Sequence, residues 1–195
     1  MDRYFLDSCA LAKRYLAEPG QTWIQDLCAS GSIIYISQLA TVEVVTAIRR
    51  GTASQIERAH GQNKQRLIRA RHQLIQTFQD HCNTDYAIRV LTPATFERAA
   101  LLAGNNGIQS LDAVQLAGAI LAQEYCITNG LDVPAFISAD VRLLKIAQRH
   151  LSRLDNPEEH RLPDEESVLT NDWRAKAEKI GRRVYEYSMR LNRGR

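Results

Sequence analysis

The chain has 195 residues, of which 45% are hydrophobic and 24% charged, with a net charge of +3 at pH 7. This length suits one α/β domain with added elements and is too short for two full-sized domains. No apolar run approaches the length of a membrane span, and the N-terminus is acidic where a signal peptide would be basic and then apolar. We therefore expect a cytoplasmic protein with no membrane partner.

The cysteines and histidines of the sequence do not occur at the spacings of a metal site. The four cysteines form no Cys-x-x-Cys pair, and no two of the five histidines lie three or four residues apart. Zinc sites built on helices or knuckles need such spacings. The sequence thus speaks against a zinc site and favours reduced, mostly buried thiols.

Charge is distributed unevenly along the chain. Residues 49–73 hold seven Arg or Lys against one acid, residues 155–166 hold six acids against one Arg, and residues 172–195 hold eight basic against three acidic residues. A basic stripe can be a solvated helix face or a surface that contacts phosphates, and the sequence alone leaves both interpretations open.

Strands and helices alternate along most of the chain. Short apolar runs predict strands at 3–7, 33–37, 89–91 and 135–138. Apolar residues at helical spacing predict helices at 8–18, 21–30, 39–50, 52–82, 93–103, 111–125 and 139–151, with Gly51 as a break and Ser110 as an N-cap. The helix that begins at Pro93 should bury Phe96, Ala99, Ala100 and Leu102. This alternation predicts a three-layer α/β sandwich, a short parallel sheet covered by helices on both faces.

The predicted domain covers residues 1–157, with a helical excursion at about 52–83. Residues 158–195 are expected to form an acidic linker and a basic amphipathic helical tail. In that tail an apolar seam repeats every three or four residues, at Trp173, Ala177, Ile180, Val184, Tyr187 and Leu191.

Four carboxylates follow the predicted strands or begin the predicted helices. They are Asp7, Glu43, Asp112 and Asp140, with Ser138 two residues before the last. In an open parallel sheet the functional crevice lies beyond the C-terminal ends of the strands, so all four can reach the same rim. Any one of them could instead be an ordinary helix cap.

A cluster of four carboxylates is costly without a cation. Two carboxylates about 5 Å apart repel by roughly 3 kcal/mol at an effective dielectric near 20. Hard oxygen ligands without His or Cys suit Mg²⁺ or Mn²⁺, ions that activate water for phosphoryl chemistry. The sequence therefore favours metal-dependent nucleic-acid hydrolysis, in which Ser138 could orient a ligand or simply end its strand.

Four segments in this order, YFLDSCALAKRYLAEPG, ISQLATVEVVTAIRR, SLDAVQLAGAIL and FISADVRLLKIA, resemble the PIN-domain family and in particular its VapC-like toxin ribonucleases. The likeness spans residues 3 to 157. The family's acidic quartet matches Asp7, Glu43, Asp112 and Asp140, and Ser138 matches its usual Ser or Thr. No acid of the quartet is missing.

The resemblance implies a Mg²⁺- or Mn²⁺-dependent endoribonuclease, the toxin of a type II toxin-antitoxin pair. It also implies an RNA substrate, a homodimer and a cognate antitoxin that blocks the site. The long stretch 52–83 and the tail 158–195 depart from the pattern; the tail could dock on the domain, seal a dimer, receive the antitoxin or contact RNA.

Two other classes of protein fit the sequence less well. A catalytically silent PIN-like module that binds RNA or protein is motivated by the basic segments, although all four acids are present. A haloacid-dehalogenase-type phosphatase needs a second Asp two residues after Asp7, where Cys9 stands, and a response-regulator receiver needs an acidic pair before its acceptor strand. The sequence has neither pattern.

Overall fold

The computed structural model describes residues 1–160; of the predicted linker and tail at 158–195, residues 161–195 lie outside the described residues. Five parallel strands form one sheet in the order β3-β2-β1-β4-β5. Their bounds are β1 Arg3–Leu6, β2 Ile33–Ser37, β3 Tyr86–Arg89, β4 Ala135–Ile137 and β5 Leu154–Asp155. The predicted α/β class with an all-parallel sheet is confirmed.

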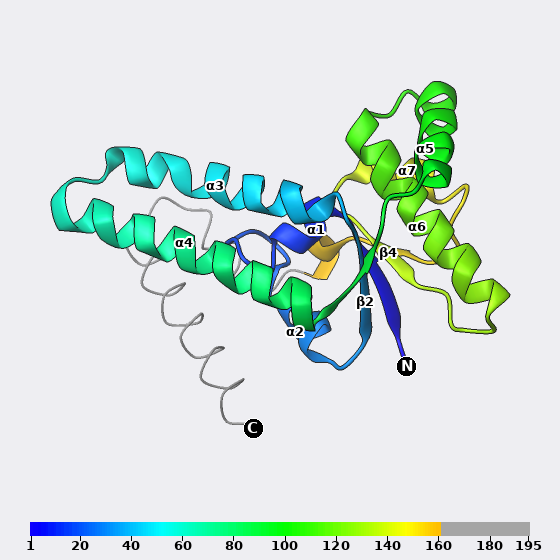
Figure 1. Cartoon of the computed structure of the whole chain (residues 1–195), viewed down its shortest axis with the longest axis horizontal. Helices are drawn as coiled ribbons and strands as arrows, with labels where there is room; N and C mark the ends of the chain where they lie inside the picture. The colour runs from blue at the N-terminus through cyan, green and yellow to red at the C-terminus, as the bar shows by residue number, and fades with distance from the viewer. Residues whose placement is uncertain (161–195) are drawn as a thin grey trace.

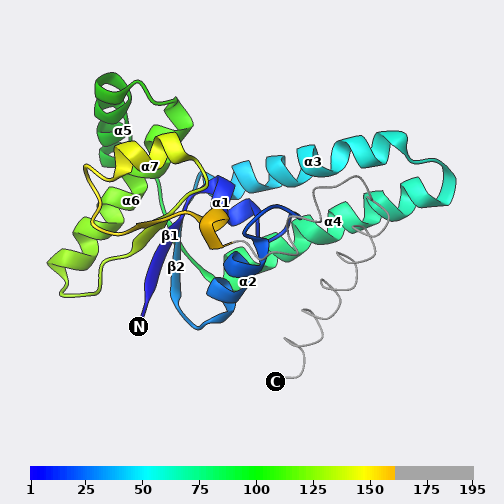
Figure 2. The ribbon, with the colours of Figure 1, turned by 180° about the vertical axis from the view of Figure 1, so that it is seen from behind.

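Helices cover both faces of the sheet, which makes three layers (Figures 1 and 2). One face is packed by α1 Ser8–Ala12, α2 Gln21–Ala29, α3 Ala40–Arg58 and α4 Gly61–Thr84. The other is packed by α5 Pro93–Asn106, α6 Ser110–Thr128 and α7 Val141–Ala147. A short 3₁₀ helix, η1, follows at Pro157–His160. In the described part of the chain no helix is long and apolar enough to cross a membrane.

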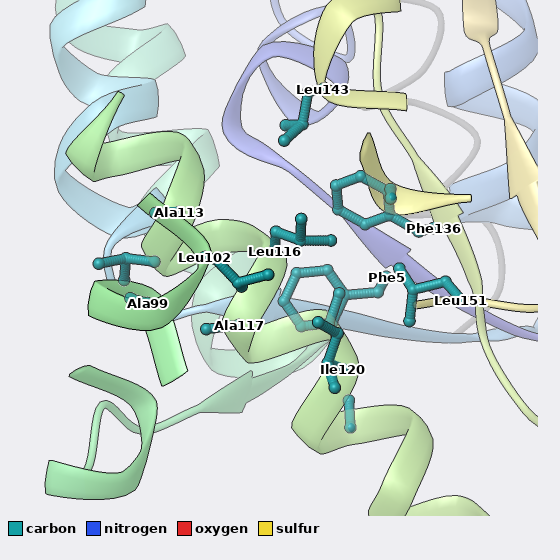
Figure 3. Close-up of a cluster of buried hydrophobic side chains, with 14 of the residues drawn as sticks. Phe5, Ala99, Leu102, Ala113, Leu116, Ala117, Ile120, Phe136, Leu143 and Leu151 are labelled. Carbon is teal, nitrogen blue, oxygen red and sulfur yellow. The ribbon is translucent and has the colours of Figure 1, made fainter. Parts of the chain in front are cut away.

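The central strand β1 feeds both hydrophobic cores. Successive side chains of a strand point to opposite faces: Phe5 belongs to the core under α5, α6 and α7, and Leu6 to the core under α1 to α4. Figure 3 shows Phe5 and Phe136 meeting Leu116 and Ile120 of α6. Because β1 pairs with β2 on one side and β4 on the other, its C-terminal end lies at the middle of the sheet edge.

The position of β3 differs from the predicted strand at 89–91. The paired residues are Tyr86–Arg89, in register with Ile34–Ser37, while Val90 is 66% exposed. The Tyr86 hydroxyl accepts a hydrogen bond from Arg14 at 2.5 Å and lies 2.6 Å from the Tyr15 hydroxyl. These tertiary contacts fix the start of the strand, and local sequence does not encode them. The two-residue strand β5 was not predicted at all.

The predicted break at Gly51 is also wrong. Helix α3 continues through Gly51 to Arg58, and the chain turns at Ala59 and His60 before α4 begins. A Cβ at residue 51 would lie 3.2 Å from Leu16 Cδ2. The glycine therefore serves close packing of α3 on the turn after α1.

Other helices differ at their ends. Helix α1 ends at Ala12, well before the predicted stop at Pro19, and α7 covers 141–147 of the predicted 139–151. Ser110 is the first residue of α6, and Gln109 holds the N-cap position. In α5 the capping box of Thr92 and Thr95 fixes the start, and the buried side is Thr95, Ala99 and Leu102. Phe96 and Ala100, both predicted inside, are exposed.

Residues 157–160 close over the loop between α1 and α2. Lys13 Nζ donates to Glu158 at 2.9 Å, and the rings of Trp23 and His160 stack with centroids 4.3 Å apart. Gly20, which N-caps α2 with φ of 81°, lies directly under Pro157. A Cβ at residue 20 would be 2.6 Å from the Pro157 carbonyl carbon and would overlap its oxygen.

Replacing Gly20 with Ala should destabilise the fold more than the same change at Gly31. Gly31 has a similar φ of 79°, but no atom lies within 4 Å of the place that a Cβ would take, so it isolates the backbone cost. We expect Gly31→Ala to cost about 1 kcal/mol from left-handed strain. Gly20→Ala should cost a further 1–3 kcal/mol or so, because a neighbouring segment must move. Urea unfolding of both variants measures the difference, and equal losses would show that Pro157 does not pack on Gly20.

Candidate active site

The four predicted acids lie on segments that begin at the C-terminal edge of the sheet or next to it. Asp7 follows β1 and N-caps α1, with its Oδ1 accepting from the Ala10 N–H at 2.7 Å. Asp140 comes after β4 and N-caps α7. Glu43 lies in the first turn of α3, which follows β2, and Asp112 in the first turn of α6. Four separate segments thus deliver one carboxylate each.

Asp7 is the most buried of these acids, with 3% of its surface exposed. Burial raises the pKa of its carboxyl from 3.8 to about 6, and the negative charge of Asp112 adds to the effect. Hydrogen bonds from Ser138, the Ala10 N–H and Cys9 act in the opposite direction by stabilising the ionised form. A carboxylate kept in this environment near neutral pH is costly, and a nearby cation would relieve the cost.

Asp112 lies within electrostatic reach of the other three. Its pKa is raised by burial first and then by the charges of Asp140 and Glu43, while Arg142 lowers it. Asp112 in turn acts on Asp7. The structure therefore places Asp112 at the centre of the predicted acids, with the other three close enough to interact with its charge.

Ser138 and Cys9 link Asp7 to Asp140. The fully buried Ser138 hydroxyl accepts from the Asp140 N–H at 3.0 Å and lies 3.7 Å from Cys9 Sγ. Cys9 Sγ donates to the two Asp7 oxygens at 3.0 and 3.1 Å. Burial and the Asp7 charge raise the pKa of the Cys9 thiol, so it stays protonated and is a hydrogen-bond donor rather than a nucleophile.

Cys9 was missed by sequence reasoning, which treated the four cysteines as buried structural thiols. All four are free, and only Cys126 is buried as a whole residue. Cys9 is exposed as a residue, but its sulfur is enclosed by Asp7, Ser138 and the Ala139 N–H. Its position two residues after Asp7 was the available signal.

Gln115 and Ser8 hold Glu43, and neither was predicted. Ser8 Oγ donates to Glu43 Oε2, and Gln115 Nε2 donates to the same oxygen at 2.6 Å and to Ser8 Oγ at 2.5 Å. Gln115 is 3% exposed, and its Oε1 is buried without a hydrogen-bond partner among residues 1–160. The signal was a glutamine in the apolar stripe of α6, three residues after Asp112 and so on a neighbouring position of the helix surface.

The donor chemistry of this group fits a hard divalent cation. It offers four carboxylates and one unsatisfied amide oxygen, all ligand types that Mg²⁺ and Mn²⁺ accept. Within residues 1–160, no group of three or more His, Cys, Asp or Glu side chains is already arranged to hold an ion. Three of the carboxylates are instead held by hydrogen bonds. Asp7 accepts from the Ala10 N–H, Glu43 from Ser8 and Gln115, and Asp140 Oδ1 from the Arg142 and Leu143 N–H groups.

Comparison with known proteins adds little to the description above. No protein-family model matches the sequence, and no curated protein matches it. Among solved structures, one similar chain belongs to the "Crystal structure of VapBC2 from Rickettsia felis bound to a DNA fragment from their promoter". The alignment has a TM-score of 0.44 and 16% identity, and covers 78% of this chain and 97% of that chain. Similarity at this level is too low to transfer function from one chain to the other.

Proposed function

We propose that this protein is a divalent-metal-dependent endoribonuclease. The observation that supports the proposal is the convergence of Asp7, Glu43, Asp112 and Asp140 at one edge of a parallel sheet, where the charges of Asp140 and Glu43 raise the pKa of Asp112 and the charge of Asp112 raises that of Asp7. Repulsion of this kind destabilises the fold unless a cation neutralises it. Four carboxylates are ligands of the type and number that a divalent cation needs.

The four acids would hold Mg²⁺ or Mn²⁺, and the ion when bound supplies an activated water and a counter-charge for the departing oxygen. Gln115 and Ser8 fix the rotamer of Glu43. Ser138 and Cys9 orient the carboxylate of Asp7 and keep it in place at the end of β1. These contacts preorganise the ligands before any ion or substrate arrives, which lowers the reorganisation needed for binding.

The choice of RNA rests on the sequence resemblance to PIN-domain ribonucleases. The same resemblance supports a cytoplasmic toxin with a cognate antitoxin and a homodimeric assembly, and we include these in the proposal. A hydrolase of this kind needs no protein nucleophile. That agrees with the protonated state of Cys9, the thiol nearest the acids.

Cleavage of total cellular RNA by the purified chain tests the proposal. We expect fragments with Mg²⁺ or Mn²⁺ and none with chelator, and we expect Asp112→Asn, prepared identically, to lose at least about a hundredfold in rate. Asn keeps the size of the side chain but removes its charge, so the fold should survive. Cleavage that persists in the variant or with chelator would contradict the proposal.

A silent binding module is the second candidate. It is favoured by the absence, in the part of the chain that the structure describes, of a ready-made ligand cluster. In that case the folded protein binds RNA without metal-dependent cleavage, and Asp112→Asn binds as the wild type does. The same cleavage assay, paired with a binding assay, separates the two candidates.

A further inference from the structure

The hairpin of α3 and α4 projects away from the sheet as a long arm (Figures 1 and 2). Its anchors are near the sheet, at Val44 and Ile48 of α3 and at Phe78 and His81 of α4. Beyond them, in residues 49–72, only Ile56 and Ala59 are buried. We call residues 49–72 the distal arm. With a rise of 1.5 Å per residue, the part of α3 in it is roughly 15 Å long.

The distal arm is strongly basic and its charges are exposed. It carries six exposed cations, Arg49, Arg50, Arg58, Lys64, Arg66 and Arg69, against the single acid Glu57. None of the ion pairs formed among residues 1–160 includes any of the six. Arg66 and Arg69, three apart on α4, are close enough to repel each other. By contrast, Lys13, Arg14 and Arg98 elsewhere in the domain are each paired with an acid.

The arm is continuous with the acidic site. Arg50 lies seven residues after Glu43 on α3, so both are on the same side of that helix, roughly 10 Å apart along its axis. The four carboxylates themselves repel a polyanion. A nucleic acid that reaches them therefore needs attraction from a neighbouring surface, and the distal arm is the basic surface that α3 connects to them.

We propose that the distal arm binds the phosphate backbone of single-stranded RNA and guides it to the acids. The inference rests on the proposed nuclease function, whose substrate it would hold. Contacts of this kind are to phosphates, so they give affinity and salt dependence rather than sequence preference.

RNA binding without metal tests the arm separately from cleavage. The probe is a short fluorescein-labelled single-stranded RNA, and the protein is the full chain carrying Asp112→Asn, titrated in chelator at several salt concentrations by fluorescence anisotropy. The arm variant is Arg50→Gln, Lys64→Gln and Arg66→Gln together. The control is Lys145→Gln, Arg149→Gln and Arg153→Gln, which removes the same charge from exposed positions in or after α7.

We expect the arm variant to bind about tenfold or more weakly, with a salt slope reduced by about 2, since each lost phosphate contact on a single strand is worth about 0.7. The control should retain most of the wild-type affinity. With the acids intact, the arm variant should raise KM and leave kcat nearly unchanged. Unchanged binding, or equal losses in the two triple variants, would overturn the proposal.

The outcomes also separate the two proposals. Loss of binding in the arm variant without any cleavage by the wild type supports the arm and rejects the nuclease. Metal-dependent cleavage with an unaffected arm variant supports the nuclease and rejects the arm, leaving its charges for another acidic partner.

Discussion

Asp7→Asn is expected to lose metal-dependent cleavage and, in the same protein, to make the metal-free fold more stable. If Asp7 holds the metal ion as proposed, the loss of cleavage should be at least about a hundredfold, because a neutral amide cannot replace an anionic ligand. The gain in stability follows from the raised pKa of about 6. An Asn at this position still accepts from the Ala10 N–H, since Asn and Asp are equally good N-caps.

The sign of the pH dependence checks this explanation. The folded pKa of Asp7 lies above its unfolded value of 3.8, so the folded state binds the proton more tightly. Its cost to stability is absent below pH 3.8 and fully present above about pH 6. The advantage of Asp7→Asn should therefore appear as the pH rises through that range and reach about 1–3 kcal/mol at neutral pH.

Asp85→Asn is the matched control, with the opposite sign. Asp85 accepts from Arg14 Nη2 at 2.8 Å, and although burial opposes ionisation, hydrogen bonds from Thr84 and Arg14 and the Arg14 charge lower its pKa overall. Its replacement should destabilise the protein at neutral pH. Chemical denaturation of both variants in chelator across the pH range measures the two effects. An Asp7→Asn protein less stable than the wild type at neutral pH would show that burial of this carboxylate is not a cost.

Gln115→Leu should weaken divalent-metal binding while leaving the acids in place. Gln115 holds Glu43 by a hydrogen bond of 2.6 Å, and its own buried Oε1 has no hydrogen-bond partner among residues 1–160. Residues that orient metal ligands typically contribute 10–100-fold to affinity or activity. We expect about that loss in Mn²⁺ affinity, measured by calorimetry on the metal-free protein, with cleavage partly recovered at high metal concentration.

Gln123→Leu, two turns further along α6, is the control for this prediction. Gln123 is also nearly buried, but it bonds to the His150 carbonyl and to Ser152, away from the acids. It should lose stability and keep its metal affinity. Equal Mn²⁺ affinities in the wild type and Gln115→Leu would show that Gln115 does not orient a metal ligand.

The sequence allowed the acidic edge to be anticipated for a general reason. Parallel strands end at a common edge, so an acid that follows Phe5 and Leu6 and an acid that follows Phe136 and Ile137 lie on the same edge once both strands are assigned. The pairing of β1 with β4, which the sequence did not predict, makes these two strand ends neighbours. The sheet class and the strand at 33–37 follow in the same way from near-continuous apolar runs.

What could not be anticipated depends on side chains from distant segments. The hydrogen bonds of Gln115 and Ser8 with Glu43 connect α6, α1 and α3, and no local sequence pattern predicts them. The start of β3 is set by Tyr86 against Arg14 and Tyr15, which outweighs the apolar run at Val90 and Leu91. Phe96 is apolar yet exposed. Apolar spacing identifies this segment as a helix, but it does not fix which side of the helix is buried.

The strand order has a consequence for the timing of folding during synthesis. β1 is the first strand to be made, but one of its two neighbours, β4, pairs Ala135 with Tyr4 across most of the domain. Contacts so distant in sequence form slowly and late. A growing chain can assemble β1, β2 and β3 with their helices, yet it lacks Ser138 and Asp140 until β4 has left the ribosome. The acidic group is therefore incomplete in every nascent chain that stops short of β4.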